Sequence, residues 1–209
     1  MARRIFVTGT DTDVGKTYIA TKLLRQFSEA GFSTLGIKPI ASGCDLINGE
    51  LINADTLSLS AAASIKTNYN IINPIAFAPP IAPHIAANLI NYKLDVAILA
   101  EKLRPALDIH ADITIIEGSG GWLLPLNKNE TLADYVIQQG FEIILVVGMR
   151  LGCLNHAALT EQSIIQAGGK LIGWIANCID LNMEYVGENI TALKNILQSP
   201  HLNTFYRLK

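Results

Sequence analysis

The sequence predicts an α/β fold in which a doubly wound, mostly parallel sheet carries helices on both faces. Short runs of continuously apolar residues recur along the chain, and such runs are typical of parallel strands that are covered on both faces. These runs alternate with segments of helical periodicity, which favours strands joined by crossover helices. The chain has 209 residues, of which 50% are hydrophobic and 16% charged, so we expect a single domain over residues 1–209.

The first elements follow one another closely. RIFVTG, residues 4–9, is expected to be a buried strand because its centre is apolar. Residues 15–30 have apolar side chains at helical spacing and are followed by Gly31, so a helix is expected there. STLGIKP, residues 33–39, is expected to be the second strand.

The same alternation continues to the end of the chain. Three further strands are expected over residues 112–118, 142–148 and 170–177. Helices are expected over residues 54–63, with Asn53 or Asp55 near its start, and over 95–107, 156–168 and 183–197. The proline-rich stretch 73–84 is the least regular and is expected to be an ordered loop. No repeat or linker interrupts the pattern.

Composition excludes several classes of protein. The net charge is −2, and a general nucleic-acid binder would show a basic excess. No apolar run reaches the length of a membrane span, and the N-terminus lacks the apolar region of a signal peptide, so we expect a cytoplasmic protein without a membrane partner. The cysteines Cys44, Cys153 and Cys178 are far apart and are expected to be buried, free thiols. The four histidines show no zinc-binding spacing.

A phosphate-binding loop is indicated by GTDTDVGKT, residues 9–17, which lies between an apolar strand and a helix. Thr10 stands where the common pattern G-x-x-x-x-G-K-S/T has its first glycine. Backbone N–H groups and the helix start would face the phosphates, Lys16 would reach the β- and γ-phosphates, and the Thr17 hydroxyl would ligate Mg²⁺. The alternative is a glycine turn followed by an exposed lysine.

Three charged residues outside the loop are further candidates. Glu117 ends a strand, where open α/β sheets bind ligands, and with Thr17 it could complete a Mg²⁺ site; alternatively it is a solvated acid. Asp55 by itself suits a helix cap. Lys38 follows the second strand, which we expect beside the first, so that Lys38 would lie near Lys16 and stabilise developing negative charge; alone it would be an exposed lysine.

Taken together, several segments resemble the dethiobiotin synthetases. These segments are GTDTDVGKT (9–17), KPIASG (38–43), EGSGGW (117–122), VVGMRLGCLNHA (146–157) and WIAN (174–177). The resemblance runs from residue 3 to about residue 180. It implies a sheet of the P-loop NTPase type and an ATP-dependent cyclo-ligase of biotin biosynthesis. Members of this family close the ureido ring of 7,8-diaminononanoate with CO₂, giving dethiobiotin, ADP and phosphate, and they act as homodimers with Mg²⁺.

The resemblance also implies roles for individual residues. Lys38 and Lys16 would be catalytic, and Thr17, Asp55 and Glu117 would bind the metal ion. The nucleotide would contact Asp13, Val14, Gly15, Lys16, Thr17, Tyr18, Asp55, Glu117, Gly118, Ser119, Gly120, Asn177, Cys178, Tyr206, Arg207 and Leu208. The substrate would contact Thr12, Ser42, Gly152, Cys153, Leu154 and Asn155, the last four across the dimer interface.

Other interpretations of these residues stay open. Asn177 suits an ordinary turn, and residues 152–157 suit a glycine loop with Asn155 near a helix cap. The resemblance implies that the phosphate loop is shared by ATP and the amine substrate, so polar groups are expected in it, but it leaves the individual roles of Asp11 and Asp13 open. Mg²⁺, Lys16 and backbone donors would offset their negative charge.

Two other functions are compatible with the same fold. A partitioning-type ATPase would often carry K-G-G-x-x-G-K-T, but Thr10 occupies the place of the early lysine. A cobyrinate-type amide synthetase would usually bring a glutaminase domain, for which 209 residues leave no room.

The last stretch, SPHLNTFYRLK over residues 199–209, departs from the family's P-L-L-G-x-I-P segment, since the glycine and second proline are missing. We therefore expect weaker discrimination between nucleotide bases than in family members that have the full segment.

Overall fold

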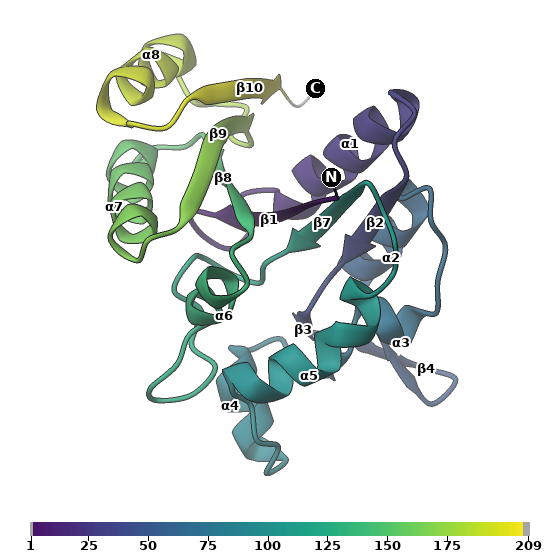
Figure 1. Cartoon of the computed structure of the whole chain (residues 1–209). Helices are drawn as coiled ribbons and strands as arrows, with labels where there is room; N and C mark the ends of the chain where they lie inside the picture. The colour runs from purple at the N-terminus through teal and green to yellow at the C-terminus, as the bar shows by residue number, and fades with distance from the viewer. Residues whose placement is uncertain (1, 207–209) are drawn as a thin grey trace.

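Six parallel strands form the central sheet of the structure, a computed structural model that describes residues 2–206. The strand order is β10-β9-β8-β1-β7-β2, as Figure 1 shows. The strands are β1 (Arg3–Gly9), β2 (Thr34–Ile37), β7 (Ile113–Glu117), β8 (Glu142–Gly148), β9 (Lys170–Cys178) and β10 (His201–Tyr206). The predicted doubly wound, mostly parallel sheet is therefore confirmed.

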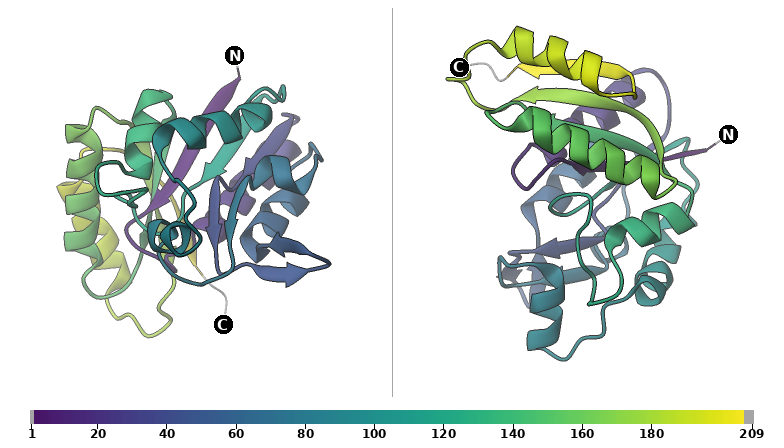
Figure 2. Two further views of the ribbon diagram at one scale, coloured as in Figure 1. Left: turned by 90° about the horizontal axis from the view of Figure 1, so that it is seen from below. Right: turned by 90° about the vertical axis from the view of Figure 1, so that its left-hand side faces the viewer.

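Helices cover both faces of the sheet (Figure 2). Helices α1 and α2 pack on one face, and α5, α6 and α7 pack on the other. The helices are α1 (Lys16–Glu29), α2 (Ala54–Ala62), α3 (Tyr69–Ile72), α4 (Pro83–Leu89), α5 (Val96–Leu107), α6 (Leu132–Gln138), α7 (Cys153–Gln166) and α8 (Val186–Ile196). None of the helices within residues 2–206 combines the length and the hydropathy that crossing a bilayer requires.

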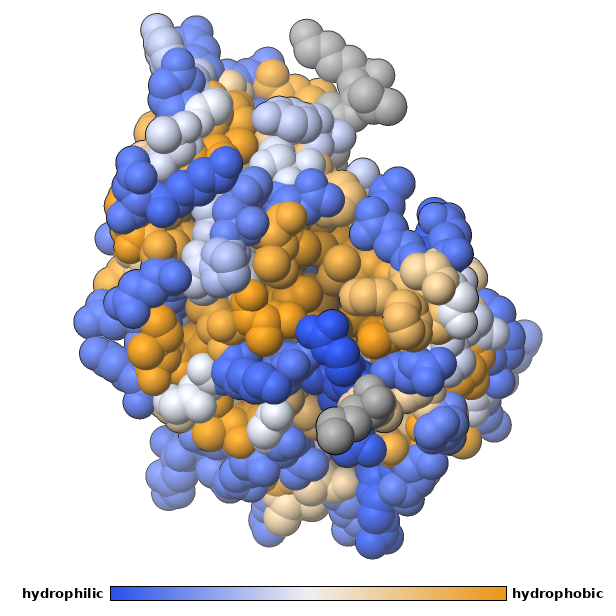
Figure 3. Space-filling view, turned by 45° about the horizontal axis from the view of Figure 1, so that its top comes forward, coloured by the Kyte–Doolittle hydropathy of each residue, from blue (hydrophilic) through white to orange (hydrophobic). Residues whose placement is uncertain are grey.

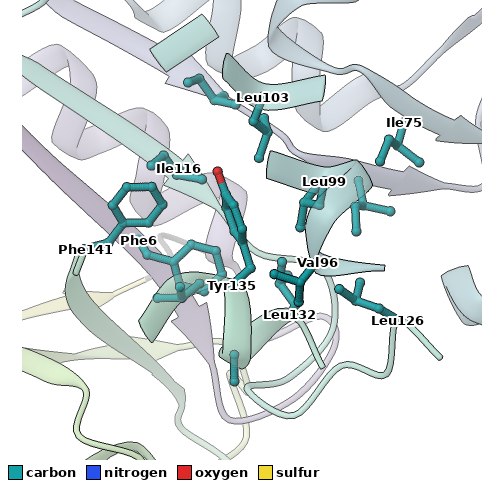
Figure 4. Close-up of a cluster of buried hydrophobic side chains, with 14 of the residues drawn as sticks. Phe6, Ile75, Val96, Leu99, Leu103, Ile116, Leu126, Leu132, Tyr135 and Phe141 are labelled. Atoms are coloured by element: carbon teal, nitrogen blue, oxygen red, sulfur yellow. The ribbon is translucent and has the colours of Figure 1, made fainter. Parts of the chain in front are cut away.

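Alternate residues of each strand enter different parts of the core. On β8, Ile144 and Val146 pack with α1, whereas Leu145 and Val147 pack with α7. In Figure 4, side chains from the sheet, from α5 and from α6, including Tyr135, converge on the face that α5 covers. Apolar side chains on both faces explain why the strands read as continuous apolar runs in the sequence.

The order of the strands corrects one expectation. We expected the first two strands, β1 and β2, to be neighbours, but β7 lies between them and pairs with both. Ile113 of β7 is opposite Arg3 of β1 and Thr34 of β2. The segment Ile113–Glu117 is buried along its whole length, which suits an inner strand. Lys38 and Lys16 therefore flank the end of β7 rather than lying at the ends of adjacent strands.

Residues 73–84 correct a second expectation, because they are not wholly a loop. They contain β6 (Ile75–Phe77), which pairs in parallel with β3 (Ile40–Ser42), and α4 begins at Pro83. The prolines concealed these elements, but the buried side chains of Ile75 and Phe77 hold β6 in place. The expected second strand is also shorter, because β2 ends at Ile37.

Short elements account for most other differences from the sequence prediction. An antiparallel hairpin joins β4 (Asp45–Ile47) and β5 (Glu50–Ile52). Helix α7 begins at Cys153, three residues before the expected start. Cys44, Cys153 and Cys178 are buried and free, as predicted.

Candidate active site

A cleft of about 970 Å³ opens at the carboxyl ends of β1, β7 and β2, the position at which open α/β sheets bind ligands. Most of the site residues that the sequence indicated line it. They are Thr12, Asp13, Gly15, Lys16, Thr17, Tyr18, Lys38, Ser42, Asp55, Glu117, Ser119 and Gly120.

The phosphate loop depends on glycine at two close approaches. Gly15 has a φ of 85°, and a Cβ there would lie 2.1 Å from Asn177 Nδ2. A Cβ on Gly9 would lie 2.5 Å from a methyl group of Val14. Thr10, by contrast, is not among the residues with positive φ, and its N–H donates to Val146 O at 3.0 Å. The loop therefore does not need a glycine at position 10.

Lys16 lies inside the loop rather than in solvent. Its side chain is buried, and Nζ donates to the carbonyl oxygen of Asp11 at 2.8 Å. Burial, with a contribution from the charge of Lys38, lowers the pKa of Lys16 to about 8. Gly15 is the N-cap of α1 and provides no side-chain cap, so the helix start presents N–H groups as an anion-binding terminus does. The alternative of an exposed lysine after a glycine turn is wrong.

Lys38 and Glu117 form a buried ion pair at the centre of the cleft. Lys38 Nζ lies 2.7 Å from Glu117 Oε1 and 3.1 Å from Asp55 Oδ2. The side chains of Lys38 and Glu117 are 5% and 1% exposed, so neither residue is the solvated strand-end group that the sequence left open. Burial acts to lower the pKa of Lys38, but the Glu117 and Asp55 carboxylates outweigh it and raise that pKa.

Asp55 is free to take part in this cluster because another residue caps α2. The Asn53 side chain accepts a hydrogen bond from Thr56 N at 3.2 Å, so Asn53 is the cap and Asp55 lies in the first turn. Burial acts to raise the pKa of Asp55, but Lys38 outweighs it and the pKa is lowered.

The donor atoms around Lys38 suit a small, hard cation. Thr17 Oγ1 donates to Glu117 Oε1 at 2.7 Å, so a hydroxyl and two carboxylates meet at one place. Glu117 Oε2 is buried and has no hydrogen-bond partner. Within residues 2–206, no three His, Cys, Asp or Glu side chains gather as a metal-binding group, so a metal ion here would also need phosphate or water oxygens as ligands.

The loop after β7 completes the wall of the cleft. A Cβ on Gly118 would lie 2.8 Å from the ring of Phe6, which explains the glycine. The Ser119 hydroxyl donates to the carbonyl oxygen of Ile40, so its hydrogen is used in an internal contact of the protein. Ser42 Oγ is buried without a partner and lines the cleft, so it is available to a ligand.

Comparison with known proteins decides which family this site belongs to. A family model described as an AAA domain matches residues 3–204. The ATP-dependent dethiobiotin synthetase of Pseudomonas aeruginosa (strain UCBPP-PA14) is 44% identical over 204 residues, which cover 98% of this chain and 90% of that protein. The enzyme of the same name from Alteromonas mediterranea is 46% identical over 210 residues, covering 96% of this chain and 90% of that protein. The chain belongs to the dethiobiotin synthetase family.

Solved structures show the same fold at much lower identity. The septum site-determining protein MinD from Pyrococcus horikoshii, complexed with Mg-ADP, aligns with a TM-score of 0.59 and 18% identity, covering 98% of this chain and 81% of that one. A ParA family ATPase from Chlorobium tepidum aligns with a TM-score of 0.59 and 14% identity, covering 99% and 84%. These matches confirm the P-loop NTPase type of sheet, whereas the sequence relatives favour a dethiobiotin synthetase over a partitioning ATPase.

Some residues that the dethiobiotin synthetase resemblance indicated do not line the cleft. Val14 of the phosphate loop is buried, and Asn177 is buried behind the loop, where its Nδ2 donates to Val14 O at 2.8 Å. Asn177 lies in β9 and is not a turn residue; its Oδ1 is buried without a partner. Cys178 is buried beside it, and Tyr206 is 62% exposed at the end of β10. Arg207 and Leu208 lie outside the described residues.

The predicted substrate residues at the start of α7 also lie away from this cleft. Gly152 is the N-cap, with a φ of 93° and no side-chain cap, so Asn155 is not the capping residue. Cys153 is buried, Leu154 is half-buried, and Gly152 and Asn155 are exposed.

Sequence reasoning gave Asp11 no role in the dethiobiotin synthetase site and missed Arg150. Arg150 Nη2 lies 2.5 Å from Asp11 Oδ2. The available signal was an acid after the first strand and a base after a later one, but the adjacency of these strands was not known from the sequence.

Proposed function

We propose that the protein closes the ureido ring of 7,8-diaminononanoate with CO₂ and ATP, in the presence of Mg²⁺, as a cytoplasmic homodimer. The observation that carries the proposal is the cluster of Lys38, Glu117, Asp55 and Thr17 beside the phosphate loop in one cleft. The chain that carries this cluster is a member of the dethiobiotin synthetase family.

The phosphate loop would bind the triphosphate of ATP. The uncapped start of α1 and the loop N–H groups would face the phosphates, and Lys16 would exchange the Asp11 carbonyl for phosphate oxygens. The base would lie toward Asn177 and the end of β10, since Asn177 Oδ1 has no partner of its own. In this arrangement the γ-phosphate would lie toward Lys38.

Thr17, Asp55 and Glu117 would hold Mg²⁺ together with phosphate oxygens. The unpaired, buried Glu117 Oε2 supports this assignment, because a buried acceptor without a partner is costly unless a ligand satisfies it. The ion would neutralise charge on the transferring phosphoryl group. Lys38, which occupies the space between the two carboxylates, supplies a second positive charge at the same place.

Thr12 and Ser42 would bind the carbamate that forms when an amine of the substrate takes up CO₂. A carbamate is a poor electrophile, so a carbamate oxygen first attacks the γ-phosphorus and ADP leaves. The neighbouring amine then attacks the carbonyl carbon of the carbamic–phosphoric anhydride, loses its proton and expels phosphate. Lys38 and Lys16 would stabilise the negative charge in both steps, and ring closure is favoured because the amine is on the same molecule.

The start of α7 would complete the substrate site of a second copy of the chain. An uncapped helix start with exposed Gly152 and Asn155 suits the substrate carboxylate but lies outside the cleft of its own chain. Large apolar side chains near it are exposed, Leu151 by 98% and Leu159 by 57%. Exposed apolar side chains such as Leu151 and Leu159 favour association. Apolar residues also lie at the surface across the middle of the face that Figure 3 shows.

The test is product formation by the purified chain. We expect dethiobiotin, identified by mass, when 7,8-diaminononanoate, bicarbonate, Mg²⁺ and ATP are all present, and ATP consumption that depends on the diamine. A rate of ATP hydrolysis that does not depend on the diamine, without any ring product, would instead support a partitioning-type ATPase.

A further inference from the structure

An ion pair joins the phosphate loop to the turn that precedes α7. Arg150 Nη2 lies 2.5 Å from Asp11 Oδ2, although the two residues are 139 positions apart. They meet because β1 and β8 are neighbouring parallel strands, so the loops that follow them lie at the same edge of the sheet. The N–H of Thr10 also donates to Val146 O at 3.0 Å, which ties the start of the loop to β8.

Asp11 makes contacts with two residues that line the cleft. Its Oδ1 accepts a hydrogen bond from Thr12 N at 2.7 Å, and its carbonyl oxygen accepts one from Lys16 Nζ at 2.8 Å. Thr12 and Lys16 line the cleft, whereas Asp11 does not. A rotation of the Asp11 carboxylate would therefore displace the backbone of Thr12, and a shift of its main chain would displace the resting position of Lys16.

The charge of Asp11 is unfavourable for a loop that binds a polyphosphate. Contact with the Arg150 guanidinium offsets that charge before the nucleotide arrives. The two side chains are 39% and 47% exposed, and a pair of that exposure contributes at most about 1 kcal/mol to folding. The pair is therefore better suited to orienting Asp11 than to stabilising the fold.

We infer that Arg150 is a positioning residue: it holds the Asp11 carboxylate and so fixes the loop segment that carries Thr12 and Lys16. This inference rests on the proposed function, because it assigns Arg150 to the same site. Arg150 also lies two residues before Gly152, the N-cap of α7. The contact thus links the phosphate loop to the helix start proposed to serve a second copy of the chain.

A double-mutant cycle tests the inference through Michaelis constants and thermal stability. Arg150→Met and Asp11→Asn should each raise the KM for ATP roughly tenfold, with the melting temperature little changed, because small displacements of binding groups are costly. The double variant should be no worse than the worse single variant, since both break one contact. Arg150→Lys keeps the positive charge but lacks the planar guanidinium group, so its KM for ATP should lie between those of the wild type and Arg150→Met. Arg25→Met, at an exposed position on α1, is the matched control and should match the wild type.

An unchanged KM in Arg150→Met, or additive effects in the double variant, would overturn the inference. Should Arg150→Met fail to fold, Arg150→Lys combined with Asp11→Asn provides the same cycle: non-additive changes in KM support the inference and additive ones refute it. A wild-type chain that makes no dethiobiotin would refute the proposed function itself. If the wild type makes dethiobiotin and Arg150→Met has an unchanged KM for ATP, only the role of Arg150 is refuted.

Discussion

At the scale of single residues, the site is organised around buried charges that compensate one another. Lys38 is enclosed by two carboxylates, and Lys16 is held by a backbone carbonyl. A buried charge is tolerated only when it has such partners. Lys16 would exchange its carbonyl partner for phosphate oxygens, and the two carboxylates beside Lys38 would become ligands of a metal ion, so binding would rearrange these contacts rather than fill an inert cleft.

Glu117→Gln should raise the Mg²⁺ concentration needed for half-maximal activity. The substitution preserves the shape of the side chain and removes its charge, and even the loss of a group that only supports a metal ligand typically costs about 10–100-fold in metal affinity or activity. Activity would be measured across a Mg²⁺ titration, with Glu101→Gln on the exposed face of α5 as the control. A Mg²⁺ titration identical to that of the wild type would refute the metal-binding role of Glu117.

Nucleotide affinity should fall as the pH rises through the pKa of Lys16, which is about 8 in the protein. That pKa is lowered from the ordinary value of 10.5, so the free protein carries the Lys16 charge below about pH 8 and loses it above. Phosphate binding requires the charged form. Binding of a non-hydrolysable ATP analogue would be measured at pH 7 and pH 9. The affinity of the wild type should be lower at pH 9 than at pH 7, and the affinity of Lys16→Ala should change much less. Equal pH dependence in both proteins would contradict this account.

At the scale of elements, the strand β10 is held in place by a buried acid on α7. Glu161 is 4% exposed and accepts hydrogen bonds from Gln198 N at 2.8 Å and Ser199 N at 2.9 Å, and from the Ser199 hydroxyl. These donors lie in the turn that leads into β10. The acid therefore connects α7 to the edge strand that the sequence did not predict.

Glu161→Ala should lower the free energy of unfolding by about 1–3 kcal/mol, because the partly buried N–H groups of Gln198 and Ser199 would lose their acceptor. Urea denaturation of the variant and the wild type would measure the difference. Gln162→Ala, at the exposed neighbouring position on α7, is the control and should stay within about 0.5 kcal/mol of the wild type. A loss below about 0.5 kcal/mol for Glu161→Ala would show that the turn is held by other contacts.

The long helices and strands could be predicted because their hydrophobic periodicity is a local property of the sequence. The order in which the strands lie side by side could not be predicted in the same way. β7 separates β1 from β2 because strand order follows crossover connections rather than sequence order. Helix α6 has only seven residues, and its capping box of Thr131 and Asp134 was the available signal.

Most cleft residues could be predicted from motifs that follow strands. The pairing of Asp11 with Arg150 could not, because it depends on which strands are adjacent.

At the scale of the whole molecule, the edge strand β10 lies beside the candidate active site. β10 pairs with β9 as far as Tyr206, opposite Cys178, and Phe205 packs edge-on against Tyr18 with ring centroids 6.0 Å apart. Tyr18 lines the cleft directly after the phosphate loop. The segment 201–206 is thus a strand, with an irregularity in its pairing between His201 and Asn203, and it lacks the glycine and second proline of the family pattern.

This strand should allow weaker discrimination among nucleotide bases than in family members with the full segment. Losing one hydrogen bond of about 0.5–1.5 kcal/mol would reduce selectivity roughly tenfold or less while leaving the phosphate contacts intact. The ratio of kcat to KM would be compared for ATP, CTP and GTP at saturating diamine. A preference for ATP above about a hundredfold would mean that Asn177 and the strand as it stands suffice to select adenine.

The most direct measurement follows oxygen from CO₂ into the released phosphate. If a carbamate oxygen attacks the γ-phosphorus and ring closure then expels phosphate, that oxygen leaves with the phosphate. With ¹⁸O-labelled CO₂, supplied faster than it exchanges with water, each dethiobiotin formed should be matched by a phosphate that carries one ¹⁸O atom. Phosphate without label, formed alongside unchanged diamine, would show that water attacks ATP in this cleft and would contradict ring closure through a phosphorylated carbamate.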